Sequence, residues 1–221
     1  EHSSSEEVLK PFLRGRDVKR WRCEPQDLWL IFTRRGIDIK KYLAIHDHLK
    51  QFKKALTSGI PGGRKPGSYE WYEIQDNIAY WQEFEQPKVL YQEIATYQAF
   101  AWDDSGAYTN NKTFLIPEAA KMLLALLNSS VCWWFLGQTA SKLQGGAYAM
   151  QSPYVSAIPI PPATSDQQRW CEWLAEALIW LHGPEAKKAK DESSGLMAAY
   201  FEQWLNGLVY ELFFPSELHA R

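Results

Sequence analysis

The middle of the chain alternates short apolar runs with turn-forming residues, a pattern typical of short β-strands. The runs predicted as strands are DLWLIFT (27–33), WYEI (71–74), KVLYQEIA (88–95), AFAW (99–102) and TFLI (113–116). The first of these is rich in leucine, isoleucine and aromatic residues, so we expect a buried strand. The tetrapeptide DDSG at 103–106 favours a turn between the last two runs and predicts that they pair in antiparallel fashion.

Apolar residues spaced three and four positions apart predict an amphipathic helix from Tyr42 to Leu56. On this helix Lys50, Lys53 and Lys54 are expected to point to solvent. The helix should end at TSGIPGGRKPGS (57–68), whose glycines and prolines predict an exposed loop. Without DNA we expect this loop to be poorly ordered or displaced from the rest of the domain.

A largely buried helix is predicted after the last strand, beginning at Pro117 and continuing to Gly137. Two further amphipathic helices close the chain, and the first begins with a capping-box pattern at Ser165 and Gln168. The simplest arrangement of these two helices is a hairpin.

These elements predict an α+β fold with two parts. Residues 8–162 would form a small twisted, mostly antiparallel sheet with packed helices, and residues 163–221 a helical hairpin attached to it. Four of the eleven tryptophans lie in apolar patterns and are expected in the core: Trp29, Trp133, Trp134 and Trp173.

Charge is distributed unevenly along the 221 residues. The formal net charge is −2, yet residues 1–70 carry 15 Lys and Arg against 9 Asp and Glu, while residues 71–221 carry 9 against 17. A basic region on an otherwise acidic chain favours a nucleic-acid partner. No run approaches 18 uncharged apolar residues and the N-terminus is unlike a signal peptide, so a cytoplasmic location is expected. Cys23, Cys132 and Cys171 are far apart and are expected to be free thiols.

Six segments resemble, in the same order, those of one known family. They are LKPFLRGRDVKRW (9–21), KPGSYEWYEIQ (65–75), PKVLYQEIA (87–95), DDSGAYTNNKTFLI (103–116), LLALLNSSVCWWFLG (123–137) and GGAYAMQSPYVSAIPIP (145–161). The family is the TaqI-like C-terminal specificity domain, the target-recognition part of Type II and IIG restriction–modification DNA methyltransferases. The resemblance implies a bacterial, non-catalytic domain that recognises a duplex DNA sequence beside a methyltransferase domain.

The resemblance does not extend to catalytic motifs. The methyltransferases carry an Asn/Asp/Ser-Pro-Pro-aromatic motif, whereas Ser152-Pro153-Tyr154 lacks the second proline. No glycine-rich turn after a strand suggests a site for S-adenosylmethionine, which is expected only in a methyltransferase domain outside this chain. The parent enzyme is expected to be an adenine-specific methyltransferase or restriction endonuclease.

Other chemistry has little support. Asp38-Ile39-Lys40 has the shape of a nuclease motif, but such triplets are common. His46 and His48 are two positions apart on a helix, so their side chains point about 200° from one another and would not share a metal ion. We therefore predict no catalytic and no metal-binding residues.

The DNA-binding candidates come from basic segments and from two polar loops. Candidates for phosphate contacts are Lys10, Arg14, Arg16, Lys19, Arg20, Arg34 and Arg35. Candidates for base contacts are Arg64, Lys65 and Tyr69 in the first loop, and Gln138, Lys142, Gln144 and Tyr148 in the second. The alternative is a module that packs on a partner methyltransferase domain without contacting DNA, and a weak salt dependence of DNA binding would favour it.

Overall fold

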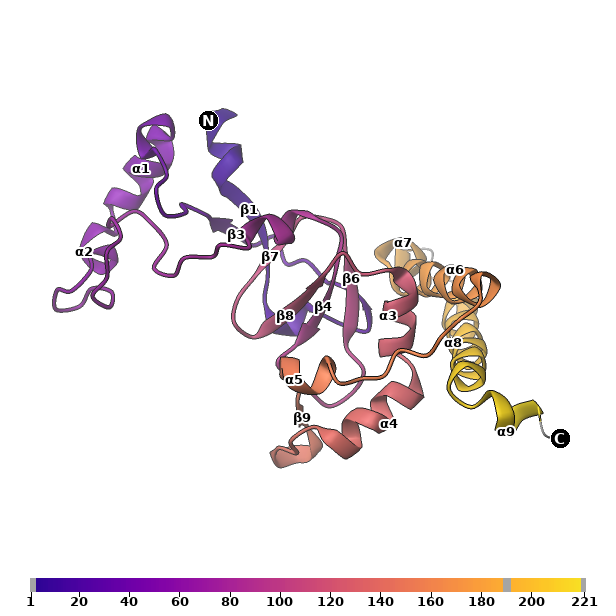
Figure 1. The fold of residues 1–221 in the computed structure, drawn as a ribbon. Coiled ribbons are helices and arrows are strands. Elements are labelled where there is room, and N and C mark those ends of the chain that lie inside the picture. The colour runs from indigo at the N-terminus through magenta and orange to yellow at the C-terminus, as the bar shows by residue number, and fades with distance from the viewer. Residues whose placement is uncertain (1–2, 189–191, 220–221) are drawn as a thin grey trace.

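The structure is a computed structural model that describes residues 3–188 and 192–219 (Figure 1). Its strands form three small sheets. The central sheet has the order β2 (Trp21–Arg22), β6 (Phe100–Asp103), β4 (Lys88–Gln92), β8 (Thr113–Pro117). The second sheet has the order β3 (Trp29–Ile31), β1 (Leu9–Leu13), β7 (Tyr108–Thr109). The third pairs β5 (Ile94–Ala95) with β9 (Tyr148–Ala149). The predicted α+β class is confirmed, although the single expected sheet is divided into three.

The central sheet corrects the predicted strand pairing. β4 lies between β6 and β8 and is antiparallel to both, so AFAW and TFLI do not pair with each other. After the DDSG turn the chain instead adds β7 to the second sheet, parallel to β1. β2 also pairs in parallel, with β6. A local turn signal identified the change of direction but not the partner strand, because strand partners are chosen by tertiary packing.

The WYEI segment is not a strand, which corrects a second prediction. The backbone N–H of Glu73 donates to the carbonyl of Glu70 and closes a turn. Ile74 N–H donates to the Thr33 carbonyl, and the Ile74 side chain packs against the cluster around Phe32. The apolar residues of this segment therefore fill a core from an irregular backbone.

Nine α-helical segments lie in the described part of the chain. They are α1 (Leu43–Lys50), α2 (Lys53–Leu56), α3 (Lys121–Leu127), α4 (Ser130–Thr139), α5 (Ser152–Val155), α6 (Ser165–His182), α7 (Pro184–Lys188), α8 (Glu192–Phe213) and α9 (Pro215–His219). Short 3₁₀ turns lie at Ser3–Val8, Gly15–Asp17, Ile39–Lys41, Trp81–Glu85 and Gln144–Gly146.

Two of the predicted helices are interrupted. The helix expected from 42 to 56 divides into α1 and α2, and the one expected from 117 to 137 divides into α3 and α4. At the second break Ser129 caps α4 by accepting from Cys132 N–H, while the buried Asn128 amide bonds both backbone groups of Phe100. Pro117 ends β8 instead of starting a helix. These breaks fix α3 against the central sheet.

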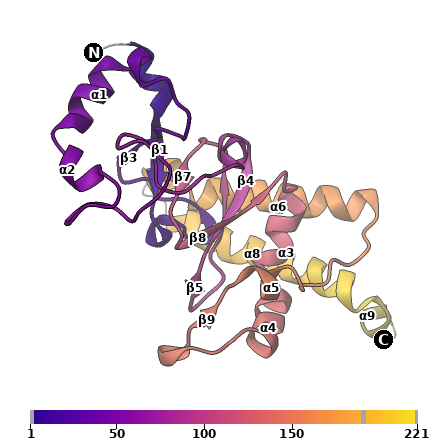
Figure 2. The same ribbon diagram turned by 60° about the vertical axis from the view of Figure 1, so that its left-hand side comes forward.

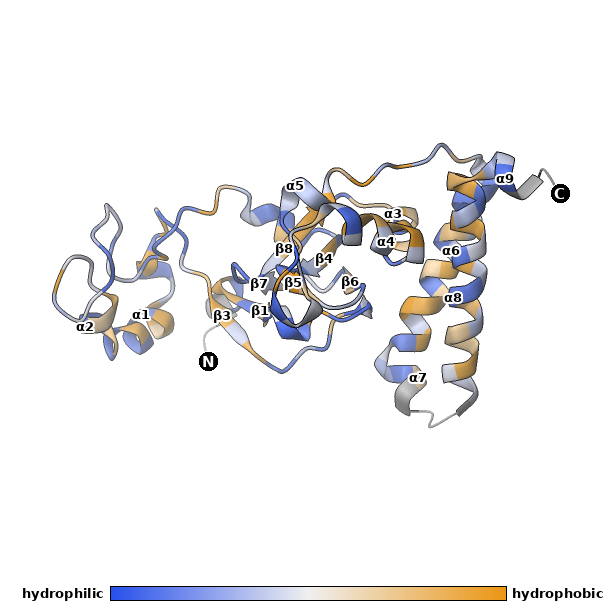
Figure 3. Cartoon of the chain, turned by 90° about the horizontal axis from the view of Figure 1, so that it is seen from below, coloured by the Kyte–Doolittle hydropathy of each residue, from blue (hydrophilic) through white to orange (hydrophobic). Residues whose placement is uncertain are grey.

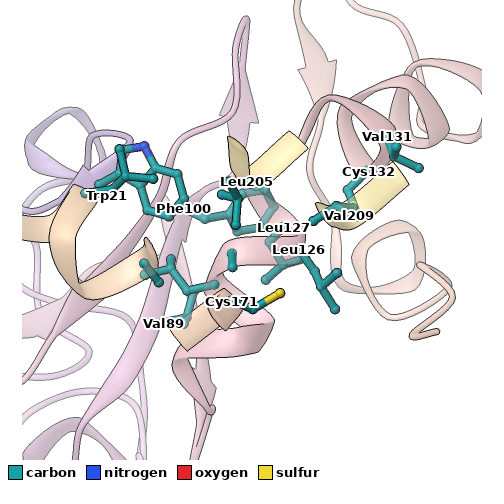
Figure 4. Close-up of a cluster of buried hydrophobic side chains, with 14 of the residues drawn as sticks. Trp21, Val89, Phe100, Leu126, Leu127, Val131, Cys132, Cys171, Leu205 and Val209 are labelled. Carbon is teal, nitrogen blue, oxygen red and sulfur yellow. The ribbon is translucent and has the colours of Figure 1, made fainter. Parts of the chain in front are cut away.

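The last two long helices form the predicted hairpin. Thr164 and Gln167, one position before the predicted pair, make the capping box of α6. α6 packs on α8, on α3 and on β2. As a result the largest core is shared by the central sheet and the hairpin, and it includes Trp21, Phe100, Cys171 and Val209 (Figure 4).

The tryptophans expected in the core lie mostly outside it. Trp29, Trp134 and Trp173 are 60%, 64% and 46% exposed, and Trp133 is half-buried. The tryptophan that is fully buried is instead Trp21, at the end of the basic segment 9–21. An apolar sequence neighbourhood thus indicated helix and strand, but not which face of each is covered.

The elements extend in two directions from the central sheet. α1, α2 and the 57–68 loop form an arm at one end, and the α6–α8 hairpin lies at the other (Figures 1 and 3). In the described residues, no helix is both long and apolar enough to span a membrane.

Candidate nucleic-acid interface

A narrow hairpin, residues 141–149, projects from the end of α4 and is here called the terminal ribbon (Figure 1). Lys142 pairs with Tyr148, and the Leu143 and Ala147 backbones are hydrogen bonded across it. At its tip Gly145 and Gly146 have φ of 79° and 76°, a left-handed conformation that glycine adopts without strain. A two-stranded ribbon of this kind is narrow enough to enter the major groove of B-DNA.

The side chains of the terminal ribbon divide into exposed and supporting groups. Lys142 and Gln144 are exposed, as is Gln138 at the end of α4. Tyr148 is half-buried, with its ring against Trp133 at 5.2 Å between centroids. A Cβ on Gly137 would lie 3.2 Å from the Tyr148 hydroxyl. Tyr148 therefore packs beneath the ribbon, and its role as a base-contacting residue stays a prediction.

The basic segment near the N-terminus lies at the base of the terminal ribbon. A Cβ on Gly15 would lie 2.9 Å from the Lys112 carbonyl oxygen, which accepts from Glu93 N–H. The Glu93 carbonyl in turn accepts from Met150 N–H, directly after β9. Four segments distant in sequence therefore meet here, and together they place Arg16 near the base of the ribbon.

Two candidate phosphate contacts belong to this basic segment and stay predictions. Arg16 is exposed and Lys19 is half-buried. Sequence reasoning missed a third cation in the same place, Lys112, which is 61% exposed and pairs with Glu93 at 2.7 Å. The signal that could have found it is the polar YTNNK turn (108–112), which precedes the TFLI strand.

The arm presents a different arrangement. Arg64 donates to the carbonyls of Leu56 at 2.7 Å, Glu73 at 2.6 Å and Trp71 at 2.9 Å. Its guanidinium also lies over the Tyr69 ring, and Arg35 lies over the same ring. Arg64 and the buried Tyr69 thus hold the 57–68 loop together, which removes both from the base-contacting candidates.

Replacing Arg64 with alanine should loosen the arm rather than change DNA specificity. Three buried or half-buried carbonyls would lose a charged donor, and each such bond contributes about 1.5–3 kcal/mol. We expect faster hydrogen exchange and proteolysis across 57–73, with β4 and β6 unchanged. Replacing the exposed Lys65 with alanine is the matched control and should leave exchange in the arm at the parent rate.

Other cations predicted to contact phosphates are also engaged internally. Lys10 pairs with Glu85 at 2.5 Å, Arg14 makes two bonds to the Asp17 carboxylate, and Arg35 donates to the Gln75 carbonyl. Arg20 bonds Glu202 and the Asn128 carbonyl, each at 2.9 Å. These arginines and the lysine contribute to the fold. The Arg20 guanidinium already bonds Glu202 of the hairpin, so it is not free to bind a phosphate.

The residues that stay candidates for DNA contacts fall in two groups. Lys65 belongs to the arm, where Lys54 is also exposed, and Arg34 lies before the arm in sequence, over the Trp81 ring. Arg16, Lys19, Lys142 and the two glutamines belong to the ribbon end of the molecule. In Figures 1 and 2 the arm and the ribbon are well separated, so the two predicted loops do not form one surface.

The motifs considered for other chemistry have structural contacts. The His46 ring packs against Trp71 and Tyr72, and Asp38 caps a 3₁₀ turn by accepting from Lys40 N–H. Ser152 and Pro153 begin α5, and the Tyr154 hydroxyl bonds Ser141 at 2.6 Å. Across residues 3–188 and 192–219, no group of three His, Cys, Asp or Glu side chains is placed to hold a metal ion.

Comparison with known proteins supports the assignment of the fold. Residues 10–160 match the family of the TaqI-like C-terminal specificity domain. A curated relative, Type II methyltransferase M.BstVI of Geobacillus stearothermophilus, is 24% identical over 172 residues, which are 73% of this chain and 30% of the relative. The Type IIL restriction–modification enzyme MmeI, solved in complex with DNA, aligns with a TM-score of 0.64 and 18% identity over 95% of this chain and 28% of its own.

The chain belongs to the TaqI-like C-terminal specificity domain family, because the family matches more than half of its length. It spans less than a third of the two longer proteins that it resembles. The likeness to MmeI is a likeness of fold, and it includes the helical hairpin.

Proposed function

We propose that this chain recognises a specific duplex DNA sequence on behalf of a DNA methyltransferase, with the terminal ribbon as its base-contacting element. The observation that carries the proposal is the ribbon itself, within a chain of the specificity-domain family. It has a glycine tip, exposed Lys142 and Gln144, and a basic segment at its base.

The chemistry of the ribbon suits direct readout. Glutamine can bond the N6 and N7 positions of adenine in a bidentate manner, and lysine can donate to the O6 and N7 positions of guanine. The cations at the ribbon base would contact phosphates and fix the register of the ribbon in the groove. Family membership favours this function over a docking module that does not contact DNA.

The remaining parts of the proposal concern the parent protein. M.BstVI is a Type II methyltransferase, so we propose that a methyltransferase domain accompanies this chain and binds S-adenosylmethionine. A preference for adenine and a fused endonuclease are finer proposals that rest on the resemblance. A cytoplasmic location follows from the proposed substrate.

Two substitutions should separate positioning from recognition. Replacing Arg16 with alanine should weaken binding to all sequences alike and reduce the salt slope by about one unit, since phosphates are the same at every step. Replacing Gln144 with alanine should cost about 1–3 kcal/mol on the preferred site alone and relax one base position. The measurement is a titration against a randomised-site library and a fixed non-specific duplex at two salt concentrations.

Matched controls lie next to each other on α6, away from the ribbon. Arg169 and Gln168 are both exposed, and their alanine variants should bind DNA like the parent. The experiment is run with the chain alone and with its methyltransferase domain attached. If Arg16→Ala and Gln144→Ala both bind DNA like the parent, with the chain alone and with the methyltransferase domain attached, the proposed interface is wrong.

A further inference from the structure

The central sheet ends at β8, and among the described strands none pairs with its outer edge. The strand order is β2-β6-β4-β8, so β8 has a neighbouring strand on one side only. Figure 1 shows this edge on the side of the sheet away from the α6–α8 hairpin. An edge strand presents unpaired backbone donors and acceptors, to which a further strand can add.

The hydrogen bonds beside β4 show which backbone groups of β8 face outwards. Glu93 N–H donates to the Lys112 carbonyl, directly beyond the paired ends of β4 and β8. Bonded and non-bonded pairs alternate along antiparallel strands, so Tyr91 bonds Phe114, and the Leu115 backbone turns away from β4. The N–H and the carbonyl of Leu115 therefore lie on the open edge, where no other described residue bonds them.

A cleft of 670 Å³ is lined by β8 and by residues between 76 and 84. The β8 residues in its lining include Thr113, Phe114 and Leu115. Its volume is within the usual range of ligand sites, about 300–1,000 Å³. The Thr113 hydroxyl is buried and has no hydrogen-bond partner, although buried polar groups are normally bonded. The cleft thus offers an extended segment both space and backbone partners.

The charge of this cleft is negative. Asp76 and Glu83 line it, and no lysine or arginine does. In the part of the chain that the structure describes, no ion pair joins either carboxylate to another residue. The Tyr80 ring also lines the cleft, is 56% exposed, and can receive a cation on its face. Two carboxylates repel phosphates, so the cleft suits a lysine or arginine side chain and not DNA.

We propose that β8 is a docking edge for an extended, basic segment of the methyltransferase part of the parent protein. The segment would add a strand to the central sheet at Leu115 and bring a lysine or arginine to Asp76 and Glu83. This inference rests on the proposed function, which supplies the accompanying domain.

Two arguments favour an occupant from the same protein. An open sheet edge promotes aggregation, so a segment that covers it permanently protects the chain. A single added strand binds weakly by itself, and a covalent link raises its effective concentration to the millimolar range. This chain spans less than a third of M.BstVI and of MmeI, so a protein of their kind contains ample further sequence.

The first test uses the chain alone and two short acetylated peptides. In one peptide arginine alternates with valine, and in the other glutamate replaces arginine. The arginine peptide should bind about tenfold more tightly, because the two carboxylates attract it and repel the other. On binding, amide hydrogen exchange should slow at Leu115. Phe114 and Ile116, which already bond β4, should keep their exchange rates.

Charge variants show whether the cleft itself is the site. Asp76→Asn combined with Glu83→Gln should abolish the preference for the arginine peptide. Asp166→Asn combined with Glu176→Gln is the matched control, because it makes the same change of charge at two exposed positions of α6. Thermal unfolding of both double variants at the parent midpoint shows that the fold is kept. Equal binding of the two peptides to the parent chain, or binding of neither at millimolar concentration, would overturn the inference.

The second test attaches the methyltransferase domain. Leu115 should then exchange slowly without added peptide, and the arginine peptide should no longer bind. If Leu115 exchanges as fast as in the chain alone, the domain does not occupy the edge and the inference is wrong. If light scattering shows that the chain alone is a dimer whose Leu115 is already protected, a second copy occupies the edge and the inference is again wrong.

The randomised-site titration measures the proposed function separately. A chain that selects a DNA sequence while Leu115 stays unprotected keeps the proposed function and loses this inference. A chain whose Leu115 is protected by the attached domain, but which selects no DNA sequence, keeps the docking edge and loses the proposed function.

Discussion

Replacing Asp103 with alanine should destabilise the fold by about 3–5 kcal/mol, the typical cost of leaving a buried charge without its partner. Lys88 is fully buried, and its ammonium lies 2.5 Å from the Asp103 carboxylate. Its other close contact is the Phe84 carbonyl at 2.6 Å. Denaturant unfolding monitored by tryptophan fluorescence measures the change.

A matched control and a double substitution sharpen this prediction. Asp104 is the exposed neighbour, and Asp104→Ala should change stability by less than about 0.5 kcal/mol. Combining Asp103→Ala with Lys88→Met removes both charges, so the double variant should be more stable than Asp103→Ala alone. Equal stability of the Asp103→Ala variant and the parent would show that the pair contributes nothing.

Replacing Glu202 with alanine should cost about 2–4 kcal/mol, because one carboxylate joins the hairpin to the central sheet. It accepts from the Arg20 guanidinium and from the Trp21 indole, each at 2.9 Å, and His182 lies 3.5 Å away. Without it the half-buried Arg20 guanidinium loses one of its two acceptors, and the indole N–H of the fully buried Trp21 loses its acceptor. Hydrogen exchange should rise in α6 and α8 before it rises in β4.

The contribution of Glu202 should also depend on pH. Burial raises its pKa, but His182, the Arg20 charge and the Trp21 indole together outweigh burial, and the net pKa is lowered. A carboxyl whose pKa is lower in the folded chain stabilises it above the unfolded value of about 4.3. That stability is lost as the pH falls through the folded pKa.

The pH prediction is tested by comparing the parent with Glu202→Gln. The difference in unfolding free energy should be full at pH 7 and should shrink as the pH falls below about 4. Glu176→Gln is the control on the same hairpin, since Glu176 is 56% exposed and pairs with Lys121 on the surface. A surface pair of this kind contributes about 0–1 kcal/mol. A difference for Glu202→Gln that does not change with pH would contradict the lowered pKa.

The corrections to the predicted interface have one physical cause. A sequence shows that Arg20, Arg35 and Arg64 are cationic, but not which carbonyls and carboxylates tertiary structure brings to them. Arg64 bonds carbonyls up to nine residues away, whereas Arg20 bonds a carboxylate 182 residues away. A guanidinium has five donors, so internal acceptors compete with phosphate for the same group.

The family, the α+β class, the closing helical hairpin and several of the strands could be predicted from the sequence alone. Apolar periodicity and the order of six family-like segments are properties of the sequence itself, so both can be recognised without knowing the tertiary contacts.

The strand partners, the covered helix faces and the neighbours of the ribbon could not be predicted without the fold of the whole chain. β4 lies between β6 and β8, Trp21 is buried in place of Trp29, and β5 (Ile94–Ala95) pairs with β9 of the terminal ribbon. Each of these depends on contacts between segments far apart in sequence. Packing of the whole chain selects among such contacts, and no local pattern records the choice.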